Sequence, residues 1–128
     1  MSALADSNVN ATIPAGDLER AKIFYADKLG LKPDEERPEG LRFRCGDGEF
    51  LLFESSGEPS GAHTQLGWHV DDVEATVAEL RANGVVFEEY DLPGLKTVNG
   101  IAEIAGDKGA WFKDSEGNLL AIGGRISS

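Results

Sequence analysis

Cysteine, histidine and positive charge are scarce in this sequence. A single cysteine, Cys45, among 128 residues excludes an internal disulfide, so we expect a cytoplasmic protein. The 12 lysines and arginines are outnumbered by 23 acidic residues, giving a formal net charge of −11. This charge repels phosphate backbones and anionic lipids, so no nucleic-acid partner is expected. It would attract a cationic ligand, although a well-hydrated acidic surface explains it more simply.

Long apolar runs are absent as well. No stretch approaches the roughly 20 apolar residues of a membrane-spanning helix, so no membrane partner is expected. Apolar residues still make up 41% of the chain, which is typical of a globular domain and argues against disorder. The sequence also shows no Ser-His-Asp order, no phosphate-binding glycine loop and no cysteine set with zinc spacing. No residue is therefore assigned a catalytic role.

The sequence does contain a strand-helix unit that occurs twice. The first copy starts with alternating residues 9–13 and continues into a helix that ends near Gly30. The second starts with residues 65–70 and its helix ends at Gly84. Asp17 and Asp72 are suited to cap the two helices, because a carboxylate accepts from the free N–H groups of the first turn. An internal repeat of this length dictates the architecture.

Alternation along the two repeated strands separates their residues into faces. The buried faces are expected to carry Val9, Ala11 and Ile13 in the first strand and Leu66, Trp68 and Val70 in the second. The opposite faces carry Asn10, Thr12, Gln65, Gly67 and His69. We expect the first set to pack against the helices and the second to face an open side of the sheet.

Further strands follow each helix. They are predicted at 31–36, 41–45 and 49–55 in the first half, and at 85–90, 100–105, 110–113 and 119–123 in the second. The segment around Pro93 and Gly94 is predicted to be a loop. The first half then has the order β-α-β-β-β, and the second half repeats it with one additional strand after the helix. We expect a single domain, 1–128, with module one at 8–56, a polar linker at 57–63 and module two at 64–124.

Three segments carry a family resemblance. They are Asp17-Leu-Glu-Arg-Ala with Phe24-Tyr25 and Leu29-Gly-Leu31, then His69-Val-Asp-Asp-Val73, and last Ala110-Trp-Phe-Lys-Asp-Ser-Glu-Gly-Asn118. In this order and spacing the chain resembles the vicinal oxygen chelate superfamily, which includes glyoxalase I, extradiol dioxygenases, fosfomycin-resistance enzymes and bleomycin-resistance proteins. The resemblance implies an α+β fold in which two βαβββ modules form a curled mixed sheet, a half-barrel around a concave pocket, with the helices on the convex side. It also implies a homodimer.

The resemblance further implies where a metal would bind. Enzymes of this family hold one divalent metal, typically by two His and two Glu, and those positions fall here at Asn10, Gln65, Glu54 and Ala121. Only Glu54 keeps a ligand type. One carboxylate with two amides holds zinc, iron or nickel poorly, so we expect no metal and no other cofactor. His63 and His69 do not replace the ligands, since six strand residues span roughly 20 Å.

A ligand pocket without a metal remains the leading expectation. The candidate ligand-binding residues are Asn10, Thr12, Phe50, Leu52, Glu54, Gln65, Gly67, His69, Tyr90, Trp111 and Ala121. They combine apolar walls with a few polar groups, as small-molecule sites do, although core packing explains Trp111 equally well. The predicted function is a metal-free protein that sequesters a small molecule. The alternative is a metal-dependent glyoxalase-like isomerase, lyase or dioxygenase acting on a small oxygenated substrate.

Overall fold

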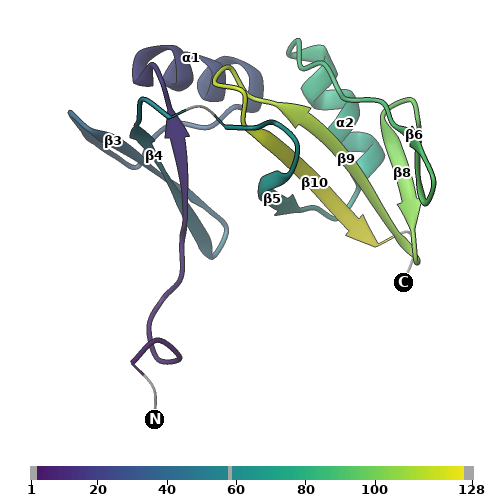
Figure 1. Cartoon of the computed structure of the whole chain (residues 1–128), viewed down its shortest axis with the longest axis horizontal. Helices are drawn as coiled ribbons and strands as arrows, with labels where there is room; N and C mark the ends of the chain where they lie inside the picture. Colours follow the sequence, from purple (N-terminus) through teal and green to yellow (C-terminus); the bar gives the residue numbers. More distant parts are fainter. Residues whose placement is uncertain (1–2, 58, 126–128) are drawn as a thin grey trace.

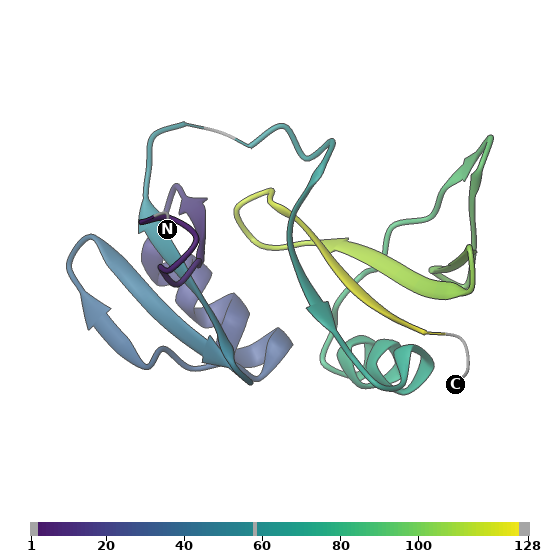
Figure 2. The ribbon, with the colours of Figure 1, turned by 90° about the horizontal axis from the view of Figure 1, so that it is seen from below.

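Two βαβ-type modules lie side by side in the protein. The computed structural model describes residues 3–57 and 59–125. Module one contains β1 (Ala11–Ala15), α1 (Leu18–Leu29), β2 (Glu35–Arg37), β3 (Gly40–Cys45) and β4 (Gly48–Glu54). Module two contains β5 (Thr64–His69), α2 (Val73–Ala82), β6 (Asp91–Leu92), β7 (Leu95–Val98), β8 (Ile101–Ile104), β9 (Asp107–Lys113) and β10 (Leu119–Arg125). Figure 1 shows α1 along the top of module one and α2 behind β9, and Figure 2 shows the modules next to each other from below.

The two sheets repeat one topology. The first has the strand order β1-β4-β3-β2 and the second β5-β10-β9-β8-β7-β6. In each sheet the strand before the helix runs parallel to the last strand of the module, and the remaining pairs are antiparallel. The predicted α+β class and the open arrangement of curled, mixed strands are confirmed. Hydrogen bonding divides the strands into a sheet of four and a sheet of six, and neither closes into a barrel.

Both helices begin and end where the sequence predicts. Asp17 and Asp72 have extended backbones, and their carboxylates accept hydrogen bonds from the N–H groups of Arg20 and Ala75. Gly30 ends α1 in the left-handed conformation at φ 73°, which an L side chain rarely adopts. These caps orient α1 over β3 and β4 and α2 over β9 and β10.

The core lies between the helices and the sheets and continues across both modules. In module one Tyr25 packs against Phe43 and Phe50, with ring centroids 5.4 and 5.8 Å away. The Phe50 ring meets the edge of Trp68 from β5 at 5.9 Å and so joins the modules. Trp68 lies on the helix-facing side of β5, as the alternation predicts.

The structure corrects the start of the first strand and a strand of the second half. Val9 is 89% exposed, because β1 pairs with β4 only from Ala11 onward. Residues 85–90 form no strand and make one bridge, between Phe87 and Phe112. The Glu88 N–H still donates to the Trp111 carbonyl, but the segment then turns to β7, where the backbone of Tyr90 exchanges hydrogen bonds with Thr97. The predicted loop around Pro93 is instead the turn of a hairpin formed by β6 and β7.

The turn between β9 and β10 locks module two onto module one. The buried Asp114 carboxylate accepts hydrogen bonds from the Tyr25 hydroxyl at 2.8 Å and from Asn118 Nδ2 at 2.9 Å. It also accepts from the backbone N–H groups of Glu116 and Asn118. Asn118 is 0% exposed, and its amide donates a second hydrogen bond to the Pro14 carbonyl on β1. Burial and the Asp114 charge raise the pKa of the Tyr25 hydroxyl, which therefore stays protonated as the donor.

An ion pair at the same turn makes stability depend on pH. The hydrogen-bonded Arg20 guanidinium lowers the pKa of the Glu116 carboxyl from 4.5 to about 2, and hydrogen bonds from Ser115 and the Asp17 N–H act in the same direction. This stabilisation is complete above pH 4.5 and is lost as the pH falls toward 2. The Arg20 side chain is 57% exposed, so solvent screens the ion pair, and its contribution to the free energy of unfolding is about 1–2 kcal/mol.

Glu116→Gln should therefore be less stable than the wild type at neutral pH, and the difference should shrink as the pH approaches 2. Urea unfolding across this pH range measures the difference directly. Glu19→Gln, an exposed carboxyl in the first turn of α1, is the control. A Glu116→Gln deficit that is unchanged at low pH would contradict this assignment.

Close packing of β5 against β10 requires a glycine at position 124. A Cβ there would lie 2.4 Å from the Val70 carbonyl oxygen, whereas a Cβ on the neighbouring Gly123 would meet only the Lys108 carbonyl at 3.5 Å. Gly124→Ala should lower the free energy of unfolding by about 2 kcal/mol or more, because backbone must move. Gly123→Ala should change it by about 0.5 kcal/mol or less. Equal effects of the two substitutions in chemical denaturation would refute this account.

Candidate functional site

The open face of the second sheet carries a shallow groove of about 380 Å³. Ala121 on β10 pairs with Gly67 on β5 and with Trp111 on β9, so these three residues form a row across the sheet. Because side chains alternate along each strand, these three residues lie on the face of the sheet opposite the helices. His69 and Gly123 extend the groove along the strands, with Gly109 beside Trp111. A groove of this size falls within the range of small-molecule sites.

Trp111 is held in one orientation above this floor. Its Nε1 donates a hydrogen bond to the Thr64 hydroxyl at 3.2 Å. The far end of the ring lies over Gly109, where a Cβ would be 3.3 Å from the indole. Tyr90 meets it edge to face, with ring centroids 5.8 Å apart. A side chain fixed from three sides offers a flat aromatic surface and loses little entropy when a ligand stacks on it.

The groove is open above β5 because Gly67 has no side chain to fill it. A Cβ added to Gly67 would make only ordinary contacts with Ala121, at 3.5 and 4.0 Å, so no close packing demands a glycine there. Its absent side chain leaves the space above β5 open beside Trp111. Gly67 can thus be replaced by a larger residue to fill the groove without disturbing the sheet.

Some of the ligand-binding residues predicted from the sequence lie together in the groove. Gly67, His69, Trp111 and Ala121 line it, and Tyr90 supports Trp111. Sequence reasoning missed Thr64, Gly109 and Gly123. Alternation along residues 107–113, which puts Gly109 on the same face as Trp111, is the signal that identifies the second of these.

The remaining candidates lie elsewhere. Phe50 and Leu52 are 2% and 0% exposed and belong to the core on the helix side of the first sheet, so an open-face ligand does not reach them. Asn10 and Thr12 are exposed on module one, and Asn10 precedes β1. Gln65 is on β5, beside the irregularity in its pairing with β10, and it does not line the groove.

The residues present do not fit the divalent metal of the family's enzymes. Glu54 pairs with Ala15 at the end of β1, whereas Asn10 lies before the first pair, Ala11 with Phe50. Five strand residues separate the two side chains by roughly 15 Å, too far to share one ion. Glu54, the one position that keeps a ligand type, therefore does not lie beside Asn10 in the register of β1 with β4. Within residues 3–57 and 59–125, no three His, Cys, Asp or Glu side chains gather into a metal-binding group.

The two histidines do not build another centre. His69 lies in the groove, and His63 precedes β5, where its Nδ1 is 3.2 Å from the Ser60 hydroxyl. Cys45 is partly buried at the end of β3 and forms no disulfide. Among the described residues, the His69 and Cys45 side chains form no hydrogen bond, and the exposed His63–Ser60 pair has no third group to orient it.

The open face of the first sheet differs sharply from that of the second. Arg42 lies at its centre, 2.5 Å from Asp34, 3.6 Å from Glu35 and 3.7 Å from Glu49. The hydrogen bond with Asp34 raises the pKa of the guanidinium. This face is charged, and its buried Arg42 Nε has no hydrogen-bond partner among the residues that the structure describes. The groove on module two is instead lined mainly by carbon surface, which suits an apolar or aromatic ligand better.

Comparison with known proteins identifies the family of this chain. A family model described as the Glyoxalase/Bleomycin resistance protein/Dioxygenase superfamily matches residues 9–122. The chain belongs to this superfamily. A search of curated proteins finds no sequence match for this superfamily member. None of the helices described by the structure is long and apolar enough to cross a membrane.

Several solved structures share the fold. The antibiotic binding protein TnmS3 from Streptomyces sp. is 25% identical with a TM-score of 0.67, covering 94% of this chain and 98% of its own. UcmS2 is 23% identical with a TM-score of 0.72, covering 91% and 97% of the two chains. A lactoylglutathione lyase from Agrobacterium tumefaciens is 21% identical with a TM-score of 0.66, covering 93% of each. Thus both a binding protein and an enzyme share this architecture.

Proposed function

We propose that this superfamily member binds a small molecule in the groove on module two without a metal and without transforming it. The observation that carries the proposal is the fixed Trp111 above a floor of Gly67 and Ala121. A ligand with a flat, unsaturated or aromatic portion fits such a surface by stacking. The similarity to an antibiotic binding protein supports a binding role.

The chemistry of the neighbouring side chains supports binding over catalysis. The groove contains one titratable group, His69, and otherwise carbon surface, backbone and the Trp111 ring. General acid–base or nucleophilic catalysis needs a second, oriented group within hydrogen-bond reach. The net charge of −11 favours a cationic ligand through long-range attraction.

A thermal-shift screen in chelator tests the proposal. Cationic antibiotics, thiol adducts of 2-oxoaldehydes and catechols are each added with EDTA or with zinc, nickel, iron or manganese. A ligand at about 100 times its dissociation constant stabilises the protein by roughly 2.7 kcal/mol, which is readily measured for a domain of this size. We expect equal stabilisation in EDTA and in metal. If stabilisation and turnover appear only with metal, the protein is a metal-dependent enzyme and the binding proposal is wrong.

We also propose that the protein is a cytoplasmic homodimer. The groove is open along one side, and apolar side chains remain exposed on neighbouring strands, namely Val98, Ile104 and Leu92 in module two and Phe53 in module one. A second copy would cover such surfaces and the outer strand edges. Sedimentation equilibrium at micromolar concentration should give twice the chain mass of 13.7 kDa. A monomer mass alone would refute the dimer.

A further inference from the structure

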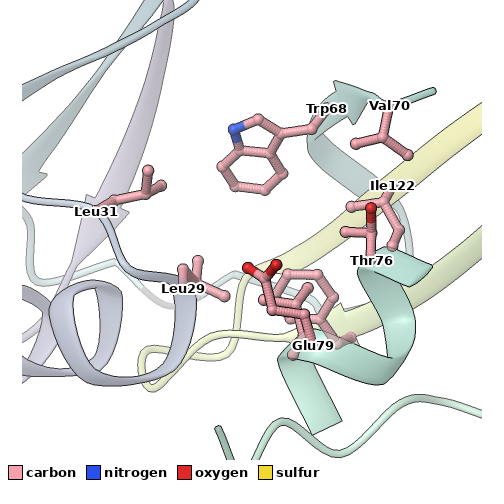
Figure 3. A pocket seen from close by; sticks show the side chains of 9 residues that line it. Leu29, Leu31, Trp68, Val70, Thr76, Glu79 and Ile122 are labelled. Atoms are coloured by element: carbon pink, nitrogen blue, oxygen red, sulfur yellow. The ribbon is translucent and has the colours of Figure 1, made fainter. Parts of the chain in front are cut away.

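A second, smaller pocket lies on the other face of the second sheet. It is a crevice of about 150 Å³ between the end of α1 and module two (Figure 3). Leu29 and Leu31 form one wall, Trp68 forms another, and Phe112 and Ile122 form the base below α2. Along β5, Trp68 faces this crevice while Gly67 and His69 face the groove. The two sites therefore lie on opposite faces of the sheet, and Trp68 and Ile122 border both of them.

The crevice contains one acidic group without a partner. The Glu79 carboxylate on α2 points into the space between Leu29 and Trp68 (Figure 3). In the part of the chain that the structure describes, Glu79 forms none of the ion pairs found. The other polar side chain, Thr76, already donates its hydroxyl hydrogen to the Asp72 carbonyl at 2.9 Å.

Lys28, the neighbour of the wall residue Leu29, does not line the crevice. Lys28 in the last turn of α1 extends its Nζ toward Gly84, where α2 ends, and its carbonyl accepts from Asn83 Nδ2. A cation at the carboxyl end of a helix is electrostatically favourable, which explains why Lys28 stays there. Glu79 is thus left as the group that determines the charge preference of the crevice.

We propose that the crevice binds a small organic cation, an amine or quaternary ammonium that carries one benzene-sized apolar group. An apolar cavity of about 150 Å³ accommodates a benzene ring. The Glu79 carboxylate and the face of the Trp68 indole both attract a positive charge, as does the carboxyl end of α1 at Leu29. The net charge of −11 adds a long-range attraction. This site is independent of the groove and of the function proposed for it.

Titration of ¹⁵N-labelled protein with benzyltrimethylammonium tests the site. The indole N–H signals of Trp68 and Trp111 report on the crevice and the groove separately. We expect saturable shifts at Trp68, with a dissociation constant of about 1 mM, and weaker binding as salt is added. The neutral compound benzyl alcohol should bind about fivefold more weakly, since it gains no attraction from Glu79.

Glu79→Gln should weaken binding of benzyltrimethylammonium about fivefold, because it removes one unit charge at contact distance while keeping the size of the side chain. Asp71→Asn, an exposed acid outside the crevice, removes the same net charge and should leave the affinity unchanged. The proposal is overturned if only Trp111 shifts, if Trp68 fails to shift up to about 10 mM, or if both variants bind alike. A response confined to Trp111 would leave the groove function intact.

Discussion

Replacing Asp114 by alanine is expected to lower the free energy of unfolding by about 3–5 kcal/mol. The substitution leaves the buried Tyr25 hydroxyl, the Asn118 amide and two backbone N–H groups without their acceptor. Each unsatisfied buried donor costs roughly 1–3 kcal/mol, although relaxation of the turn recovers part of the sum. Because the turn holds the two modules together, the loss should affect the whole domain.

Urea unfolding of Asp114→Ala, Tyr25→Phe and an exposed control, Asp107→Ala, measures this effect. Tyr25→Phe removes one hydrogen bond to a charged acceptor and should cost about 1.5–3 kcal/mol. Asp107→Ala, at the start of β9, should stay within about 0.5 kcal/mol of the wild type. A loss below about 1 kcal/mol for Asp114→Ala would show that the turn is not a main joint between the modules.

Among substitutions that remove a side chain from the groove, Trp111→Ala is expected to have the largest effect on ligand affinity. The ring is the broadest contact surface in the groove and is held by Thr64, Gly109 and Tyr90 before any ligand arrives. Truncating such an aromatic anchor typically costs about 2 kcal/mol, which is roughly a 30-fold weaker dissociation constant.

The comparison variants for Trp111→Ala separate ring contact from general damage. Trp111→Phe keeps an aromatic surface but cannot donate to Thr64, so we expect an intermediate affinity. Ile23→Ala removes an exposed apolar side chain on α1, outside the groove, and should bind as the wild type does. Calorimetric titration with a compound found in the thermal-shift screen gives these affinities. Wild-type affinity in Trp111→Ala would exclude the groove as the site.

Local sequence signals predicted the elements well. The Asp17 and Asp72 caps, the Gly30 stop and the alternation in β5 all act over a few residues, so they can be seen without a structure. The repeat then fixed the order of elements, and the resemblance gave the superfamily. Strand alternation predicted the face of Gly67 and His69 for the same reason. Ala121 was named from a ligand position that the resemblance implies, and the direction of Trp111 could not be predicted from the sequence.

Features that depend on pairing between distant segments were not predictable. The register of β1 with β4 decides that Glu54 is far from Asn10 and that Phe50 faces the core. Residues 85–90 have the sequence pattern of a strand, yet the segment leaves β9 after Glu88, and Tyr90 exchanges hydrogen bonds with Thr97 on β7 instead. The crevice at Glu79 arises where the end of α1 meets module two, and no local pattern marks that contact.

Calorimetric titration of Gly67→Leu in EDTA tests the central claim most directly. The leucine fills the groove beside Trp111, while the backbone around position 67 has room for a side chain. We predict that the wild type binds the screened ligand with the same affinity in EDTA as with added metal. We also predict that Gly67→Leu unfolds like the wild type and shows no measurable binding. Binding that requires metal, or that persists in folded Gly67→Leu, would contradict a metal-free site in this groove.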